Sequence, residues 1–275
     1  MQYAEIDGIS LEYEMTGSPE PVIFIHGALI ANSFRPLLAD PRLTDRYQLV
    51  AYHRRGYEGS SPAADSTTIA GHAGDCRRLL RYLGIEKAHV VGHSYGGIVA
   101  IQFALDYPEC VQSLSLLEAA LLAGGSASMY KESIERDIAG IRESNPADIV
   151  DAFLEVRFGK GYLPGIERTV PGAFQQALDN AITTFESDLP ALLEWHFDEA
   201  EAQRIHQPAL IVLGEKSKAL SPRFEETYDT LLRWLPDAEG FTLPDATHAM
   251  QMENPDAAAQ GLVDFLARHP IRGSA

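Results

Sequence analysis

Cysteine, basic residues and long apolar runs are all scarce in this chain. Only two of its 275 residues are cysteines, Cys76 and Cys110, so we expect no disulfide framework and a reducing compartment. Lys and Arg number 22 against 39 Asp and Glu, and the formal net charge of −17 would repel nucleic acid and anionic membranes. No apolar run is long enough to cross a bilayer, and residues 1–15 are unlike a signal peptide. We therefore expect a cytoplasmic protein without a nucleic-acid or membrane partner.

Short apolar runs alternate with helical patterns over most of the chain. Consecutive runs are therefore expected to pair as parallel strands through helical crossovers. An antiparallel hairpin that turns at Asp7-Gly8 is expected at the edge of the sheet. The pattern predicts a mostly parallel, doubly wound α/β sheet with helices on both faces and central strands over residues 21–25, 47–52, 88–91, 111–117, 208–214 and 238–243.

The alternation stops over residues 121–207. Only helical patterns occur in this stretch, and they cover residues 129–143, 146–157, 172–185 and 189–204. An insertion at this point would lie over the carboxyl ends of the strands. We predict an α/β core of residues 1–120 and 208–275 and an all-helical cap of residues 121–207.

The segment Gly92-His93-Ser94-Tyr95-Gly96-Gly97 joins an apolar run to a helical pattern. A serine at the apex of such a sharp turn has a strained backbone, and the flanking glycines leave it room. The following helix directs its N–H groups and the positive end of its dipole at the serine, where they would stabilise an oxyanion. The alternative is a glycine-rich helix entry with an inert serine. In this context the segment predicts that Ser94 is a nucleophile.

From Val91 to Gly97 the sequence resembles the nucleophile elbow of the α/β-hydrolase family, and the resemblance extends over nearly the whole chain. It implies that Ser94 attacks a carbonyl carbon and that the Ala28 and Tyr95 N–H groups form an oxyanion hole. It implies neither a cofactor nor a metal ion. The expected supporting and turn residues are His26, Gly27, Gly92, His93 and Gly96.

His248 is the expected general base. It lies in a loop between the last predicted strand and the closing helix predicted over residues 255–268, and this loop resembles the histidine loop of the family. A solvated loop histidine is the alternative. His89 and His93 are four residues apart on a predicted strand, about 13 Å, which is too far to share a metal ion.

The acid that orients the histidine is harder to assign. Most of the family place it in a G-x-x-D turn after the next-to-last strand, but here that turn ends in Ser217. Some relatives, including haloalkane dehalogenases, place it after the strand that follows the nucleophile helix, where this chain has Glu118. We expect Glu118 to be the acid. Glu215, Asp245 and the absence of any carboxylate remain as alternatives.

Residues 53–62 resemble the family's D-x-R-G-x-G-x-S loop, with two departures. His53 replaces the aspartate, and Glu58 replaces the second glycine. We expect a structural loop. Contact between one of its basic residues and a ligand is the alternative.

These features together predict a serine hydrolase. The expected substrate is a small or medium apolar carboxylic ester, or a related lactone or thioester, that forms an acyl-enzyme on Ser94. The apolar character is inferred from the aromatic residues of the predicted cap. Relatives with the same Ser and His act as carbon–carbon bond hydrolases, enol-lactonases or cofactor-free dioxygenases, and some proteins of this fold are non-catalytic ligand receptors. The sequence does not assign an oligomeric state.

Overall fold

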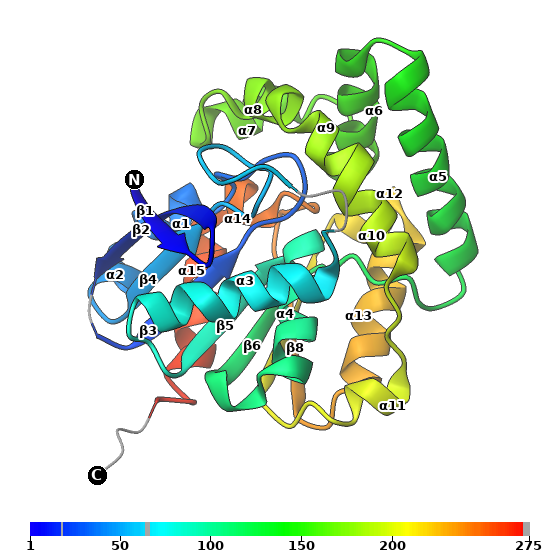
Figure 1. Cartoon of the computed structure of the whole chain (residues 1–275). Helices are drawn as coiled ribbons and strands as arrows, with labels where there is room; N and C mark the ends of the chain where they lie inside the picture. The colour runs from blue at the N-terminus through cyan, green and yellow to red at the C-terminus, as the bar shows by residue number, and fades with distance from the viewer. Residues whose placement is uncertain (18, 64–66, 272–275) are drawn as a thin grey trace.

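The computed structural model describes residues 1–17, 19–63 and 67–271, and a single sheet lies at its centre (Figure 1). The strand order is β1-β2-β4-β3-β5-β6-β7-β8. The hairpin of β1 and β2 is antiparallel and β2 pairs antiparallel with β4, whereas all other neighbours are parallel. The strands are β1 (Gln2–Ile6), β2 (Ile9–Gly17), β3 (Pro21–Ile25), β4 (Gln48–Tyr52), β5 (Ala88–His93), β6 (Val111–Leu117), β7 (Ala209–Gly214) and β8 (Ala238–Leu243).

Helices cover both faces of the sheet, which explains why the central strands are apolar throughout. On one face Ile23 and Val90 pack with α3 and α4, and on the other Val22 and Val91 pack with α1, α2 and α15. The predicted doubly wound α/β fold is therefore confirmed. The helices of this part are α1 (Arg35–Leu38), α2 (Pro41–Thr44), α3 (Ile69–Tyr82), α4 (Tyr95–Asp106), η1 (Pro108–Cys110), α12 (Ser217–Leu220), α13 (Pro222–Trp234), α14 (Met250–Glu253) and α15 (Pro255–Leu266).

The order of the strands reverses at β3, which lies between β4 and β5. In sheets of this kind ligands bind outside the carboxyl ends of the strands at such a point. The turn at residues 26–28 follows β3, and Ser94 follows β5. The two segments expected to carry the chemistry thus emerge side by side.

Residues 118–208, all of which are described, contain helices and no strand. In Figure 1 the helices α5 to α9 lie above the sheet. The Asn180 side chain donates to the carbonyl oxygen of Leu29, and the Thr184 hydroxyl accepts the N–H of Leu29. Both bonds tie this segment to the turn after β3. Its elements are α5 (Ala127–Glu143), α6 (Pro146–Phe158), α7 (Leu163–Thr169), α8 (Ala173–Asp179), α9 (Ala181–Thr183), the π-helix η2 (Thr184–Asp188), α10 (Leu189–Glu194) and α11 (Glu199–Ala202).

Three details of the predicted helices are wrong. The helix expected over 189–204 is broken at Trp195, whose backbone is extended because its indole N–H donates to Gln102 on α4 at 2.8 Å and its ring stacks on Phe197. A helix that was not predicted, α7, lies between the patterns over 146–157 and 172–185, and Pro164 stands in its first turn, where a missing N–H costs nothing. Gly172 precedes α8, and the segment expected to be one helix over 172–185 is divided among α8, α9 and η2.

Candidate active site

Ser94 stands at the apex of the turn between β5 and α4. Its backbone has φ 52° and ψ −118°, a strained conformation for a residue with a side chain, and the residue remains partly exposed. A Cβ atom on Gly96 would lie 2.0 Å from the carbonyl oxygen of Ile25, and one on Gly92 would lie 2.4 Å from that of Gly96. Glycine is therefore required at both positions, and the turn presents the Ser94 hydroxyl beyond the end of the sheet.

His248 connects Ser94 to Glu118. Its Nε2 lies 2.9 Å from Ser94 Oγ, and its Nδ1 lies 2.6 Å from Glu118 Oε2. The second carboxylate oxygen of Glu118 accepts the N–H of Gly214 at 2.8 Å. Since the carboxylate accepts both bonds, Nδ1 carries the imidazole proton and Nε2 is free to accept the serine proton.

The two alternative acids lie elsewhere. Glu215 accepts the backbone N–H of Asp245 at 2.9 Å, and the exposed carboxylate of Asp245 pairs with Lys216 at 3.0 Å. Ser217, at the position where most relatives have the acid, is buried. Among the three candidate carboxylates, the geometry favours Glu118.

Burial shapes the charges of this group. It raises the pKa of the Glu118 carboxyl, and burial together with the nearby Arg223 and Arg157 lowers the pKa of His248. A neutral imidazole is the form that can take a proton from Ser94. The surroundings of His248 therefore suit a general base.

Two backbone N–H groups are available beside Ser94. β3 and β5 pair in parallel with Ile25 opposite Gly92, so the turns that follow them are adjacent. None of the hydrogen bonds within residues 1–17, 19–63 and 67–271 uses the N–H of Ala28 or of Tyr95. Both groups can therefore donate to an oxygen atom bound at Ser94.

Two further histidines hold the turns in place. His93 Nε2 lies 2.8 Å from the carbonyl oxygen of His248. Burial and the adjacent His248 lower the pKa of His93 to about 3, so it is neutral and donates this bond. His26 Nδ1 lies 2.7 Å from the carbonyl oxygen of Gly27, and its Nε2 accepts the N–H of Arg54 at 3.0 Å.

Arg54 belongs to a buried network that the sequence did not indicate. Its guanidinium pairs with both carboxylate oxygens of Asp188, at 3.1 and 2.7 Å, and donates to the carbonyl oxygen of Gly27 at 3.1 Å. The rings of Tyr57 and Tyr95 lie on it, with centroids 4.6 and 4.5 Å away. Arg54 thus joins the loop after β4, the turn after β3 and η2. The loop of residues 53–62 contains no pattern that indicates Asp188 as the partner of Arg54, because the two residues are 134 positions apart in the sequence.

Two more buried arginines lie near His248. Phe158 and Phe224 flank the imidazole, with ring centroids 6.1 and 5.0 Å from it, and each is directly preceded by an arginine. No motif placed Arg157 or Arg223 at the site. Only folding brings them together.

Two kinds of feature are absent from the residues that the structure describes. No group of three or more His, Cys, Asp or Glu side chains among residues 1–17, 19–63 and 67–271 is arranged to hold a metal ion. None of the helices in this described part of the chain has both the length and the apolar character needed to span a bilayer.

Comparison with known proteins bears on the family and the fold. A family model described as the alpha/beta hydrolase fold matches residues 20–255. The chain is 28% identical to a 2-(acetamidomethylene)succinate hydrolase of Mesorhizobium japonicum, over 95% of this chain and 93% of that protein. It is 42% identical to the dihydrolipoyllysine-residue acetyltransferase component of the acetoin cleaving system of Cupriavidus necator, but over only 48% of this chain and 35% of that protein. The structure of a thermophilic esterase from Thermogutta terrifontis superposes with a TM-score of 0.84, at 23% identity over 98% of this chain and 100% of that one.

Proposed function

Because the chain belongs to the α/β-hydrolase family, we propose that it is a serine hydrolase that cleaves an ester or a related acyl bond through an acyl-enzyme on Ser94. One observation carries the proposal: His248 lies 2.9 Å from the hydroxyl of Ser94 and 2.6 Å from the carboxylate of Glu118. This arrangement supplies a nucleophile, a base and a group that orients the base.

The proposed reaction has two halves. In the first, Ser94 Oγ attacks the carbonyl carbon while His248 Nε2 takes its proton, and the Ala28 and Tyr95 N–H groups stabilise the oxyanion. Glu118 stabilises the imidazolium that forms. His248 then gives the proton to the leaving oxygen, and the acyl group remains on Ser94. In the second half His248 takes a proton from water, the hydroxyl adds to the acyl carbon, and the proton returns to Ser94 as the acid leaves.

The surroundings of His248 support an apolar acyl group of small or medium size. Phe158 and Phe224 flank the imidazole, so the acyl chain would contact aromatic surface next to Ser94. A carboxylic ester, a lactone or a thioester fits this proposal equally. The relative from Mesorhizobium japonicum is named as a hydrolase, and the structurally similar protein from Thermogutta terrifontis is named as an esterase.

Reaction with a fluorophosphonate tests the proposal without a guess about the substrate. Intact-mass spectrometry should find one adduct on the wild type, none on Ser94→Ala, and much slower labelling of His248→Ala. Turnover of 4-nitrophenyl acetate should follow the same order. A wild type that is folded, unlabelled and inactive on esters would contradict the proposal. Oxygen uptake with a heteroaromatic substrate would then favour a dioxygenase, and ligand binding without turnover would favour a receptor.

A further inference from the structure

We propose that Arg157 and Arg223 form a subsite for a carboxylate, so that the substrate is an acyl compound with a negatively charged end. This inference rests on the proposed hydrolase function and names its class of substrate. The apolar part of the substrate would lie against Phe158 and Phe224, and the carboxylate would lie at the two arginines.

Both arginines are placed at the site by the phenylalanines that follow them. Arg157 is in the last turn of α6 and Arg223 in the first turn of α13, so they come from the helical segment and from the α/β core. The Thr247 hydroxyl donates to the carbonyl oxygen of Phe158 at 3.3 Å, which holds the end of α6 on the His248 loop. The Arg223 guanidinium lies 3.9 Å from the centroid of the Phe224 ring, and that ring lies 5.0 Å from the imidazole of His248, so its charge is near the imidazole. Both cations accordingly lower the pKa of His248.

Arg223 is almost completely buried. It is only 7% exposed, and it makes no hydrogen bond or ion pair with any of the residues that the structure describes. Its guanidinium contacts the rings of Tyr130 and Phe224, with centroids 4.2 and 3.9 Å away. The guanidinium is planar, and its N–H bonds lie in the plane. Rings that contact its two faces therefore leave these N–H groups free to donate hydrogen bonds.

Arg157 is only partly satisfied. It is 5% exposed, donates one hydrogen bond to the carbonyl oxygen of Phe153 at 2.7 Å, and lies 3.9 Å from Asp137, too far for a hydrogen bond. Within the described part of the chain, Oδ2 of Asp137 accepts no hydrogen bond. The Arg157–Asp137 pair is therefore loose, and the remaining N–H groups of Arg157, which lie near the Tyr130 side chain, can donate to a bound anion.

Arg54 shows how this chain satisfies an arginine that has only a structural role. Its guanidinium makes a bidentate ion pair with Asp188 and donates to two backbone carbonyl oxygens, of His26 and Gly27. A buried cation without such partners is strongly unfavourable. The one acid near Arg157, Asp137, is loosely placed, and the carboxylate oxygens of Glu118 accept their hydrogen bonds from His248 and Gly214 rather than from either arginine. Guanidinium N–H groups without an acceptor among the described residues fit a bound carboxylate, which a guanidinium holds through paired hydrogen bonds.

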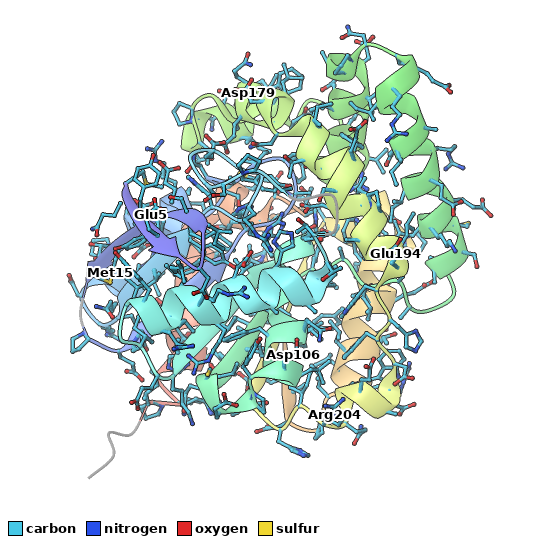
Figure 2. The ribbon with its side chains drawn as sticks, in the orientation of Figure 1. Glu5, Met15, Asp106, Asp179, Glu194 and Arg204 are labelled. Atoms are coloured by element: carbon cyan, nitrogen blue, oxygen red, sulfur yellow. The ribbon has the colours of Figure 1, made fainter. Side chains whose placement is uncertain are left out.

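The rest of the molecule is acidic, in contrast to the two arginines Arg157 and Arg223. The chain has a formal net charge of −17, and Figure 2 shows Glu5, Asp106, Asp179 and Glu194 on its outside. Such a surface does not attract anions. Selection of an anionic substrate therefore requires cations at the site itself, where the two arginines lie.

Two matched pairs of esters test the subsite from either side of the scissile bond. The first pair is mono-4-nitrophenyl glutarate and 4-nitrophenyl pentanoate, and the second is 4-carboxyphenyl acetate and phenyl acetate. In at least one pair, kcat/KM of the charged ester should exceed that of the neutral ester about tenfold or more. Arg223→Met and Arg157→Met should each lower this ratio about tenfold, and Arg223→Lys should lower it less because it keeps the charge. Arg142→Met, at an exposed position of α5, is the matched control and should leave the ratio unchanged.

Calorimetric binding of glutarate to Ser94→Ala separates this inference from the hydrolase proposal. Glutarate should bind, and adding Arg223→Met should abolish binding in a protein whose circular dichroism is unchanged. A wild type that prefers the neutral ester in both pairs and fails to bind glutarate would overturn the subsite while ester turnover upholds the hydrolase. Arginine-dependent glutarate binding by a protein that neither reacts with fluorophosphonate nor cleaves esters would uphold the subsite and overturn the hydrolase.

Discussion

Arg54 and Asp188 form a fully buried, bidentate ion pair between the loop after β4 and η2. The same guanidinium donates to the carbonyl oxygens of His26 and Gly27, directly before Ala28. The position of the proposed oxyanion donor is thus fixed by a contact with the helical segment above it. A shift of that segment would therefore move the Ala28 N–H.

Asp188→Asn should destabilise the protein by about 3–5 kcal/mol, because it leaves Arg54 buried beside a neutral group. Urea unfolding at pH 7 measures the change. Glu186→Gln breaks the exposed ion pair with Arg142 in the same segment and should cost less than about 1 kcal/mol.

Burial alone would raise the pKa of Asp188, but the charge of Arg54 outweighs it and holds that pKa below its usual range. The pair therefore stabilises the fold at neutral pH and loses its contribution in strong acid. Equal losses of unfolding free energy in Asp188→Asn and Glu186→Gln would contradict this prediction and would show that water solvates the unpaired Arg54.

Glu118→Gln should lower kcat on an ester by about 10³ to 10⁴-fold, because an amide in place of the carboxylate neither fixes the imidazole tautomer nor stabilises the imidazolium. Glu215→Gln should stay within about twofold of the wild type, since Glu215 bonds only to the backbone of Asp245. Steady-state kinetics on 4-nitrophenyl acetate compares them. A larger loss of kcat in Glu215→Gln than in Glu118→Gln would indicate that Glu215 is the acid.

The sequence was most informative where function depends on local geometry. Ser94 lies between glycines whose place is dictated by contacts under 3 Å, and such a turn has a recognisable pattern. Glu118 follows β6 and His248 follows β8. Once these strands are predicted as parallel, both residues are expected at the carboxyl edge of the sheet. Arg54 and Asp188 are 134 residues apart and meet only through tertiary packing, which leaves no local pattern. The same holds for Arg157 and Arg223, and for Trp195, where a bond to Gln102 replaces the expected helix.

His93 should make the fold sensitive to acid. Its pKa, lowered to about 3, lies below the value of about 6.5 expected in the unfolded chain, so the unfolded state binds the proton first and stability falls as pH drops below 6.5. Between pH 7 and pH 5 this single group should cost about 2 kcal/mol. His93→Asn keeps a donor for the carbonyl of His248 but does not titrate, so its loss of stability over this range should be smaller by about that amount. Urea unfolding at the two pH values tests this, with the exposed His196→Asn as control. Identical pH dependence in wild type and His93→Asn would contradict the assignment.

The last prediction concerns the pH dependence of turnover. His248 must be neutral to act, and burial, Arg223 and Arg157 lower its pKa, so the acid limb of kcat/KM for a neutral ester should lie below pH 6.5. Arg223→Met removes one positive charge, which makes protonation of His248 easier, and the limb should move to higher pH by about one unit.

A carboxylate bound at the two arginines should act on His248 in the same direction, because it offsets their charge. The limb of kcat, which reports the enzyme with substrate bound, should therefore lie at higher pH than the limb of kcat/KM for mono-4-nitrophenyl glutarate. For 4-nitrophenyl pentanoate the two limbs should coincide, since no charge arrives with the substrate. Arg142→Met should change neither profile. A limb that moves to lower pH in Arg223→Met would mean that the arginine does not act on the imidazole through its charge, and the difference between the two esters should then vanish as well.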